Sequence, residues 1–295
     1  MIHQSPFPTP AEDTPFVTFW NDVLAPKFIR FRHVLVGGLS RHSAAIMPSL
    51  DVMPGNSVLD VGCGFGDTAI DLARRVGPLG HVVGIDCCRS FLDLALQDAA
   101  QTGTSNVSFA RGDAEFGLPE NGYDFVFSRF GTMFFTNPVQ GLRSMRKALK
   151  PGGRMAHIVW RDRADNPWVN DANLVVRRFL PAPGDDAQTC GPGPFSMASE
   201  EVTRAKMEAA GFTDIDFRRI DAKVLVGRDI ADAIAFQLAI GPAGETFRTA
   251  GAIAEARRSE ITSALGELFA GVETTAEGLW MHSSSWLITA QAPEI

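Results

Sequence analysis

The chain lacks an excess of positive charge and lacks long hydrophobic runs, and each absence excludes a class of function. Its 295 residues include 27 basic and 34 acidic side chains, which gives a formal net charge of −7. Binding to a nucleic-acid backbone depends on clustered lysine and arginine, so we expect no nucleic-acid partner. A membrane-spanning helix needs about 18–20 consecutive apolar residues. Because no apolar run approaches that length, we also expect no membrane span.

Cysteine is scarce as well. The four cysteines are Cys63, Cys87, Cys88 and Cys190, and none has the CxxC spacing of a zinc site, so we predict no metal centre. A disulfide framework is not expected in a chain of this length. The start of the sequence also lacks a basic segment followed by an apolar one, the pattern of a secretory signal. Together these features predict a cytoplasmic protein.

The hydrophobic pattern predicts an α/β fold. From residue 57 onward, short β-branched runs alternate with helical stretches, which is typical of a parallel sheet covered by helices on both faces. The expected strands are 57–61, 81–86, 107–113, 123–130, 154–160, 214–224 and 284–292. The expected helices are 67–76, 90–103, 138–150 and 199–211.

The remaining segments complete the predicted organisation. Residues 1–50 are interpreted as an N-terminal helical cover, with helix from about residue 16. Residues 51–225 and 280–295 form the α/β core, with 161–197 irregular. Residues 226–279 read as helices between two late strands, which predicts a helical insertion that acts as a lid.

A glycine-rich loop follows the first expected strand in the stretch SVLDVGCGFGDTAIDLA, residues 57–73. Gly62, Gly64 and Gly66 lack the Cβ atoms that would keep a ligand away from the backbone, and the next helix offers free N–H groups. A dinucleotide fingerprint would need glycine where this chain has Asp67, and a carboxylate there would repel a pyrophosphate. The loop therefore predicts a nucleoside ligand without that phosphate.

Acidic residues at the ends of the next two strands strengthen this prediction. Asp86 lies 20 residues after Gly66, where a carboxylate can accept both hydroxyls of a ribose. Asp113, followed by Ala114, ends the third strand, where it can accept the amino hydrogens of an adenine. Each aspartate also has a purely structural interpretation, Asp86 as a helix cap and Asp113 as a turn residue.

The segments VLDVGCGFG, VVGID, GDAE and LKPGGR, at these separations, resemble the class I S-adenosylmethionine-dependent methyltransferases. They are most similar to the group around ubiquinone and menaquinone biosynthesis. The resemblance covers about residues 50–160. It implies a Rossmann-like sheet of seven mostly parallel strands, with the last strand antiparallel beside the fifth. It also implies S-adenosyl-L-methionine as cofactor and methyl transfer to a small molecule by in-line displacement.

The same resemblance implies roles for individual residues along the carboxyl ends of the strands. The first glycine loop would lie along the methionine part of the cofactor, the second strand would bind its ribose, and the third would meet its adenine. The implied cofactor-binding residues are Asp60, Gly62, Cys63, Gly64, Gly66, Asp86, Cys87, Asp113, Ala114, Ser128 and Arg129.

Aromatic residues cluster in segments that we expect near this edge of the sheet. They predict an apolar pocket for a hydrophobic or aromatic acceptor, with packing between lid and sheet as the alternative. The candidate acceptor-binding residues are Phe16, Trp20, Phe130, Phe134 and Trp160. A basic cluster over 27–33, with Arg41, is interpreted as a solvated helix face. Its alternative role is to receive an anionic acceptor or the carboxylate of the cofactor.

No residue is identified as catalytic. His33 and His42 are candidates for a general base, because the N-terminal segment folds over the cofactor in related enzymes; a surface position is the alternative for each. His157 is interpreted as a buried core histidine.

Three other functions stay open. They are a nicotinamide-dependent oxidoreductase, a cofactor-binding module without catalysis, and arsenite methylation by converging cysteines that would include Cys190. A homodimer is the default assembly for an enzyme of this size.

Overall fold

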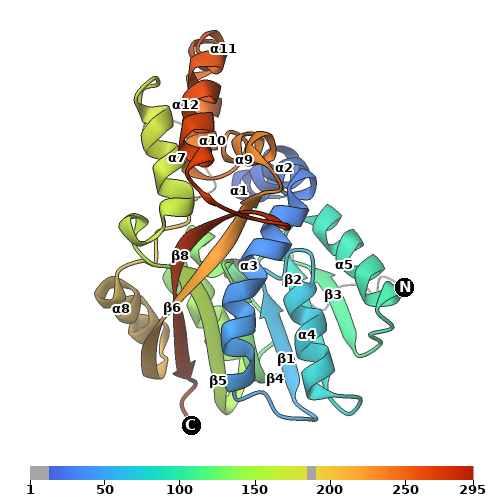
Figure 1. Ribbon diagram of the computed structural model, residues 1–295. Helices are drawn as coiled ribbons and strands as arrows, with labels where there is room; N and C mark the ends of the chain where they lie inside the picture. Colours follow the sequence, from blue (N-terminus) through green and yellow to red (C-terminus); the bar gives the residue numbers. More distant parts are fainter. Residues whose placement is uncertain (1–12, 185–190, 295) are drawn as a thin grey trace.

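The computed structural model describes residues 13–184 and 191–294, and its central feature is one mixed sheet (Figure 1). The sheet order is β3-β2-β1-β4-β5-β8-β6, and β7 pairs with β8. β1 to β5 are parallel, whereas β8 is antiparallel to β5 and β6. The strands are β1 Ser57–Val61, β2 His81–Asp86, β3 Val107–Arg111, β4 Tyr123–Arg129, β5 Leu149–Trp160, β6 Thr213–Gly227, β7 Glu273–Thr275 and β8 Gly278–Gln291. The Rossmann-like fold class, with an antiparallel last strand beside the fifth, is confirmed.

The predicted count of seven strands is wrong by one short strand, β7, and the last strand was predicted too short. β8 begins at Gly278 rather than at residue 284, and it pairs with β6 as far as Gly227. The sequence did not predict that the strand continues through the three consecutive serines 283–285, because serine is a weak strand former. In the structure these serines are buried, and two of them hydrogen-bond to His42.

Helices cover both faces of the sheet. α3 and α4 lie in front of the sheet in Figure 1, while α6 and α8 pack against each other on the opposite face. α8 starts and stops as its sequence predicts: Ser199 Oγ accepts from the Val202 N–H, and Gly211 ends the helix at φ +93°. The α-helices are α1 Pro15–Phe19, α2 Ala25–Arg30, α3 Arg32–Ile46, α4 Asp67–Val76, α5 Arg89–Gln101, α6 Pro138–Ala148, α7 Pro167–Arg177, α8 Glu200–Ala210, α9 Ile230–Gln237, α10 Gly241–Ala250, α11 Ala252–Ala256 and α12 Arg258–Ala270.

A helical cover lies over the carboxyl ends of the parallel strands. It contains α1, α2 and α9 close to the sheet, and α7, α10 and α12 packed together above them (Figure 1). α7 corrects the prediction that 161–197 is irregular: Pro167 starts the helix, and its buried face includes Val169, Ala172 and Val176. The segment 226–279 does hold α9 to α12 and β7, and its role as a lid stays a prediction.

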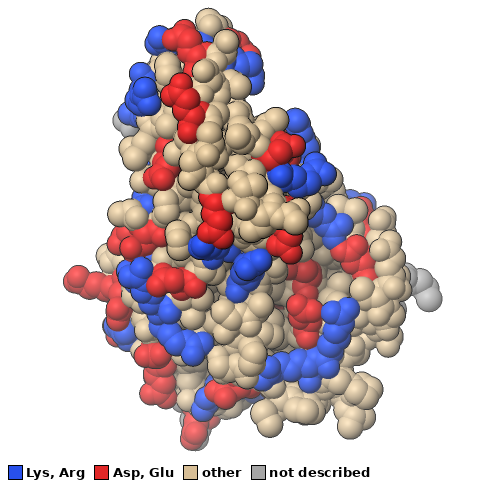
Figure 2. Space-filling model, viewed as in Figure 1, with Lys and Arg blue, Asp and Glu red and all other residues tan. Residues whose placement is uncertain are grey.

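The surface carries both signs of charge. Figure 2 shows lysine and arginine side chains interspersed with aspartate and glutamate on one face of the molecule. Within the part of the chain that the structure describes, no helix is long and apolar enough to cross a membrane.

Candidate functional site

A cavity of about 420 Å³ opens between the helical cover and the carboxyl ends of the five parallel strands. Parallel strands end at one edge of a sheet, so residues far apart in the sequence meet there. The strand-end residues that line the cavity include Gly62, Cys63, Gly64, Asp86, Cys87, Asp113, Ala114, Arg129, Phe130 and Trp160. Phe16, Trp20 and Phe134 also line it.

The structure requires glycine at different positions of the loop after β1 for different reasons. Gly64 has φ +53°, and a Cβ atom placed on it would meet nothing within 4 Å, so its bare backbone faces open space. A Cβ on Gly66 would lie 2.7 Å from Ala95 Cβ and 2.8 Å from Phe109 Cζ. Gly66 is therefore required for packing against α5 and β3, and it does not line the cavity. Its predicted contact with a cofactor stays a prediction.

Asp86 is held by backbone amides and still faces the cavity. Its Oδ2 accepts from the Gly64 N–H at 2.9 Å, and its Oδ1 accepts from the Cys88 N–H at 2.9 Å. Burial raises the pKa of this carboxyl, and the backbone hydrogen bonds act in the opposite direction. A carboxylate can accept about four hydrogen bonds, so capacity remains for ligand hydroxyls. The structural interpretation and the binding interpretation of Asp86 are thus compatible.

Asp113 follows the same design at the end of β3. Its Oδ1 accepts from the Glu115 N–H at 2.9 Å, while the residue lines the cavity together with Ala114. Burial raises the pKa of the Asp113 carboxyl.

Two of the predicted cofactor residues lie behind the cavity wall. Asp60 is fully buried; its Oδ2 accepts from Thr68 Oγ1 at 2.6 Å, and its Oδ1 has no partner among the described residues. Burial raises the pKa of Asp60 to about 7. Ser128 Oγ is likewise buried without a partner in the described chain. Neither residue lines the cavity, so their contacts with a cofactor stay predictions.

Arg129 is anchored by an ion pair that the sequence analysis missed. Its guanidinium lies 2.7 Å from Asp67 Oδ2 and also donates to Ser43 Oγ at 3.1 Å. Asp67, the residue that departs from a dinucleotide fingerprint, therefore joins the start of α4 to the end of β4. Both Arg129 and Asp67 line the cavity.

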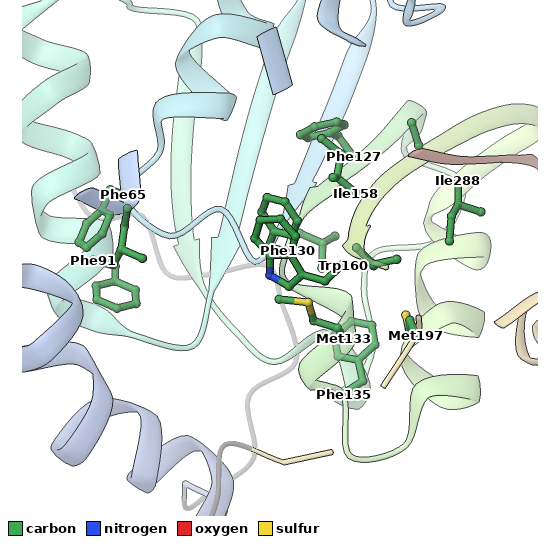
Figure 3. Packing of buried hydrophobic residues seen from close by; sticks show 14 of the residues in the cluster. Phe65, Phe91, Phe127, Phe130, Met133, Phe135, Ile158, Trp160, Met197 and Ile288 are labelled. Atoms are coloured by element: carbon green, nitrogen blue, oxygen red, sulfur yellow. The ribbon is translucent and has the colours of Figure 1, made fainter. Parts of the chain in front are cut away.

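Phe130 and Trp160 form an aromatic wall at the ends of β4 and β5 (Figure 3). Their rings stack with centroids 3.9 Å apart and planes at 16°. Phe130 has φ +56°, a conformation that bulky residues rarely adopt, and its N–H donates to Ile158 O at 2.8 Å. The strained backbone turns the Phe130 ring onto Trp160 instead of continuing the strand.

The N-terminal segment closes another side of the cavity with Trp20. The Trp20 indole meets the edges of Phe134 and Phe28, with ring centroids 5.0 Å and 5.4 Å away, and Phe16 lies at 6.3 Å. Trp20 begins a π-helical turn, Trp20–Leu24, a feature common at functional sites. Its Nε1 is buried and has no hydrogen-bond acceptor among the described residues.

The structure does not bring either candidate general base into the cavity lining. His42 is buried against the edges of Phe130 and Trp160, with Nε2 2.7 Å from Ser283 Oγ and Nδ1 2.8 Å from Ser285 Oγ. Because the Ser283 hydroxyl donates to Ala222 O, it must accept from the Nε2–H of His42. Burial lowers the pKa of His42 to about 4, so the ring is neutral at pH 7.

His33 lies outside the cavity, whereas two of the cysteines line it. His33 Nε2 lies 2.8 Å from Asp232 Oδ2 and links α3 to α9 outside the cavity. Cys63 and Cys87 line the cavity, while Cys190, which the converging-cysteine alternative requires, lies outside the described residues.

Two charged residues of the cavity lining, Arg163 and Glu245, were not predicted, whereas Lys27 was predicted only through the alternative role of its basic cluster, to receive an anionic group. Lys27, Arg163 and Glu245 line the cavity. Lys27 belongs to the basic cluster interpreted as a solvated helix face; Arg41 of that cluster is exposed and pairs with Glu277. The only signal for Lys27 was its place in that cluster, and local sequence could not show which member turns inward.

Comparisons with known proteins agree with this architecture. Residues 53–175 match the family model described as a methyltransferase domain. A demethylmenaquinone methyltransferase of Listeria monocytogenes is 34% identical over 139 residues, which cover 47% of this chain and 59% of that protein. The ubiquinone/menaquinone biosynthesis C-methyltransferase UbiE of Pseudomonas putida is 29% identical over 212 residues, covering 68% of this chain and 83% of that one.

A solved structure shows the same fold. Phosphoethanolamine N-methyltransferase 2 of Haemonchus contortus, in complex with S-adenosyl-L-methionine, gives a TM-score of 0.55 at 18% identity. It covers 97% of this chain and 62% of that one. The strand order and the match over residues 53–175 thus make this chain similar to methyltransferase domains, and the matched segment is less than half of its 295 residues.

Proposed function

We propose that this protein transfers a methyl group from S-adenosyl-L-methionine to a small-molecule acceptor with an aromatic or otherwise apolar reacting part. One observation carries the proposal: a single cavity contains both the bare glycine loop with its two aspartates and the aromatic wall. The first set suits a nucleoside with an amino-acid tail, and the second suits a flat apolar molecule.

The residues present fit the cofactor. Gly64 leaves backbone exposed to open space, and Asp86 keeps acceptor capacity for ribose hydroxyls. Asp113 offers a carboxylate for an adenine amino group, and the aliphatic and sulfur atoms of Ala114 and Cys87 provide an apolar surface beside it. When bound, S-adenosyl-L-methionine supplies an activated methyl group on a positively charged sulfur.

The contribution of the chain is positioning and exclusion of water. Holding two reactants in a productive arrangement can supply on the order of 7–11 kcal/mol of a barrier. The stacked pair of Phe130 and Trp160, together with Trp20, provides rigid surfaces for this purpose. Neither His33 nor His42 lines the cavity, so we propose that the acceptor arrives with a sufficiently nucleophilic atom of its own.

The acceptor class is supported by the relatives. Their names specify demethylmenaquinone and ubiquinone/menaquinone, with methylation at carbon in the second case. This chain spans 59% of the length of the first of them, so a quinone-type ring is proposed here as the acceptor class. A homodimer and a cytoplasmic location stay predictions from the sequence.

Titration with S-adenosylhomocysteine by calorimetry tests the cofactor half. Asp86→Ala should weaken binding about 5- to 150-fold, the equivalent of about 1–3 kcal/mol for unpaired hydroxyls. Asp124→Ala is the matched control, because that carboxylate accepts from the Ser57 N–H and pairs with Lys150 at the opposite edge of the sheet. Its affinity should equal that of the wild type. Tight binding of NADH with no binding of S-adenosylhomocysteine would instead support an oxidoreductase.

Transfer of a labelled methyl group tests the acceptor half. Unsubstituted 1,4-dihydroxynaphthalene, kept reduced, should gain label on a ring carbon in the presence of labelled S-adenosyl-L-methionine. Label on oxygen would contradict transfer to carbon, and no label would contradict the proposed acceptor class.

A further inference from the structure

Some of the positively charged side chains that line the cavity are not paired with a carboxylate of the described chain. Asp86 and Asp113 lie at the strand ends, and Arg129 is paired with Asp67. The charged residues that line the cavity are Lys27, Asp67, Asp86, Asp113, Arg129, Arg163 and Glu245. This leaves Lys27 and Glu245 of the helical cover, and Arg163 of the turn after β5, to be explained.

Lys27 lies near the carboxylate of Glu245, which an arginine already binds. Glu245 of α10 is held by Arg248, whose Nε lies 3.3 Å from Glu245 Oε2 and whose Nη2 lies 2.5 Å from Oε1. Burial and then the charge of Arg248 lower the pKa of Lys27, and Glu245 only partly opposes them. The Lys27 side chain forms no hydrogen bond or ion pair with any residue that the structure describes.

Arg163 is a second cation in the cavity lining and, unlike the half-buried Lys27, it is exposed. It lies in the short turn Arg163–Asp165 after β5, and its guanidinium sits 5.3 Å from the ring centroid of Phe195. Within residues 13–184 and 191–294 its side chain has no carboxylate partner. Two cations therefore face a cavity whose other cover residues, such as Trp20 and Phe28, are mostly apolar.

We propose that the acceptor carries an anionic oxygen group, such as a carboxylate, and that Lys27 binds this group with Arg163 as a second contact. The inference rests on the proposed function, because it describes the acceptor of that same cavity. The half-buried Lys27 is costly in free energy while no carboxylate pairs with it directly, and an anion brought by the ligand removes that cost. The neighbouring aromatic surfaces would hold the apolar ring that carries the anion.

A matched pair of probes tests this recognition. 1-Hydroxy-2-naphthoate and 1-naphthol share one ring system and one hydroxyl, and differ by a carboxylate. Each is titrated into the full chain saturated with S-adenosylhomocysteine. We expect the naphthoate to bind the wild type at least about 10-fold more tightly than the naphthol, and Lys27→Met to remove most of that difference while leaving naphthol affinity within about 2-fold.

Two further variants separate charge from packing. Lys27→Arg should retain most of the preference for the naphthoate. Arg30→Met removes an exposed cation from the same helix, outside the cavity, and should change neither affinity. Arg163→Met should weaken naphthoate binding less than Lys27→Met does, because Arg163 is the second contact.

The outcomes distinguish this inference from the proposed function. Equal binding of both probes by the wild type, equal weakening of both by Lys27→Met, or no binding of either probe at about 1 mM would overturn the anionic acceptor. In each case, retained S-adenosylhomocysteine binding would leave the methyltransferase proposal intact. If the wild type did not bind S-adenosylhomocysteine, the proposed function itself would be overturned.

Discussion

The two ends of the cavity are built in different ways. At the ends of β1 to β3, backbone geometry makes the site: Gly64 adopts φ +53°, and amide N–H groups hold both oxygens of Asp86. At the ends of β4 and β5, side-chain packing makes it, through the Phe130–Trp160 stack and the rings around Trp20. Backbone contacts tolerate few substitutions, whereas packed side chains can be exchanged. The comparison therefore predicts that the cofactor binds at the first end and that the second end determines which acceptor is bound.

The sharpest way to break this comparison is to put a side chain on the bare loop. Gly64→Val should weaken S-adenosylhomocysteine binding by at least about 1,000-fold, because the isopropyl group would occupy the open space in front of the backbone. Calorimetric titration measures the loss, and circular dichroism checks that the sheet still folds.

Gly103→Val controls for backbone strain. Gly103 has φ +65°, and a Cβ there also meets open space, but the residue follows α5 outside the cavity. Both variants should lose about 1–2 kcal/mol of stability from an unfavourable φ. If Gly64→Val and Gly103→Val bound the ligand equally well, the loop would not approach a ligand.

One titratable group near each end of the cavity should make the free energy of unfolding depend on pH, with opposite signs. The first is Asp60, beside the glycine loop. The folded state raises the pKa of Asp60 from 3.8 to about 7. It therefore binds a proton more tightly than the unfolded chain, and its stabilising contribution is lost as pH rises from about 4 through 7. A shift of this size corresponds to up to about 4 kcal/mol. Asp60→Asn should remove this loss, which urea unfolding from pH 4 to 8 would measure.

His42, behind the aromatic wall, should give the reverse slope. Its pKa falls from 6.5 to about 4 on folding, so the unfolded chain binds the proton more tightly and stability is lost as pH falls from 6.5 towards 4. The contribution is about 3 kcal/mol. His42→Gln can keep hydrogen bonds to Ser283 and Ser285, and its unfolding free energy should fall less steeply on acidification than that of the wild type. Parallel profiles for the two proteins would show that His42 does not titrate on folding.

The same contrast explains how much of the site could be predicted from the sequence. The strand-end groups from Gly62 to Ala114 occupy one continuous stretch with regular strand–helix alternation, so this alternation, together with the resemblance to methyltransferases, placed them at one edge of the sheet. The sequence did not show why a particular residue type is needed at each of these positions. Gly66 is dictated by Phe109 and Ala95, which meet it only in the folded sheet. In the sequence, Asp67 is only a departure from the dinucleotide fingerprint, and its role in an ion pair with Arg129 is visible only in the structure.

The cover was harder to predict because its contacts join distant segments. Trp20 meets Phe134 across more than a hundred residues, and Lys27 approaches α10. α7 was missed, although Pro167 marks its start, because the proline-rich loop that follows suggested irregular chain. Hydrophobic periodicity indicates that a segment buries one face, but not what it is buried against.

The smallest expected effect concerns the indole of Trp20 and would sharpen the assignment of specificity to the second end. Trp20 Nε1 is buried at the cavity without an acceptor in the described chain, whereas Trp168 Nε1, also at the cavity, donates to Asn166 Oδ1 at 3.3 Å. If the oxygen of a ligand accepts from Trp20, Trp20→Phe should weaken 1-naphthol binding about 3- to 10-fold and leave naphthalene binding nearly unchanged, since a neutral hydrogen bond contributes about 0.5–1.5 kcal/mol. Trp168→Phe should affect both probes alike, because its N–H is already used within the protein. Equal responses of the two probes to Trp20→Phe would mean that the indole supplies surface only and that the N-terminal segment closes the cavity without reading the polar group of its ligand.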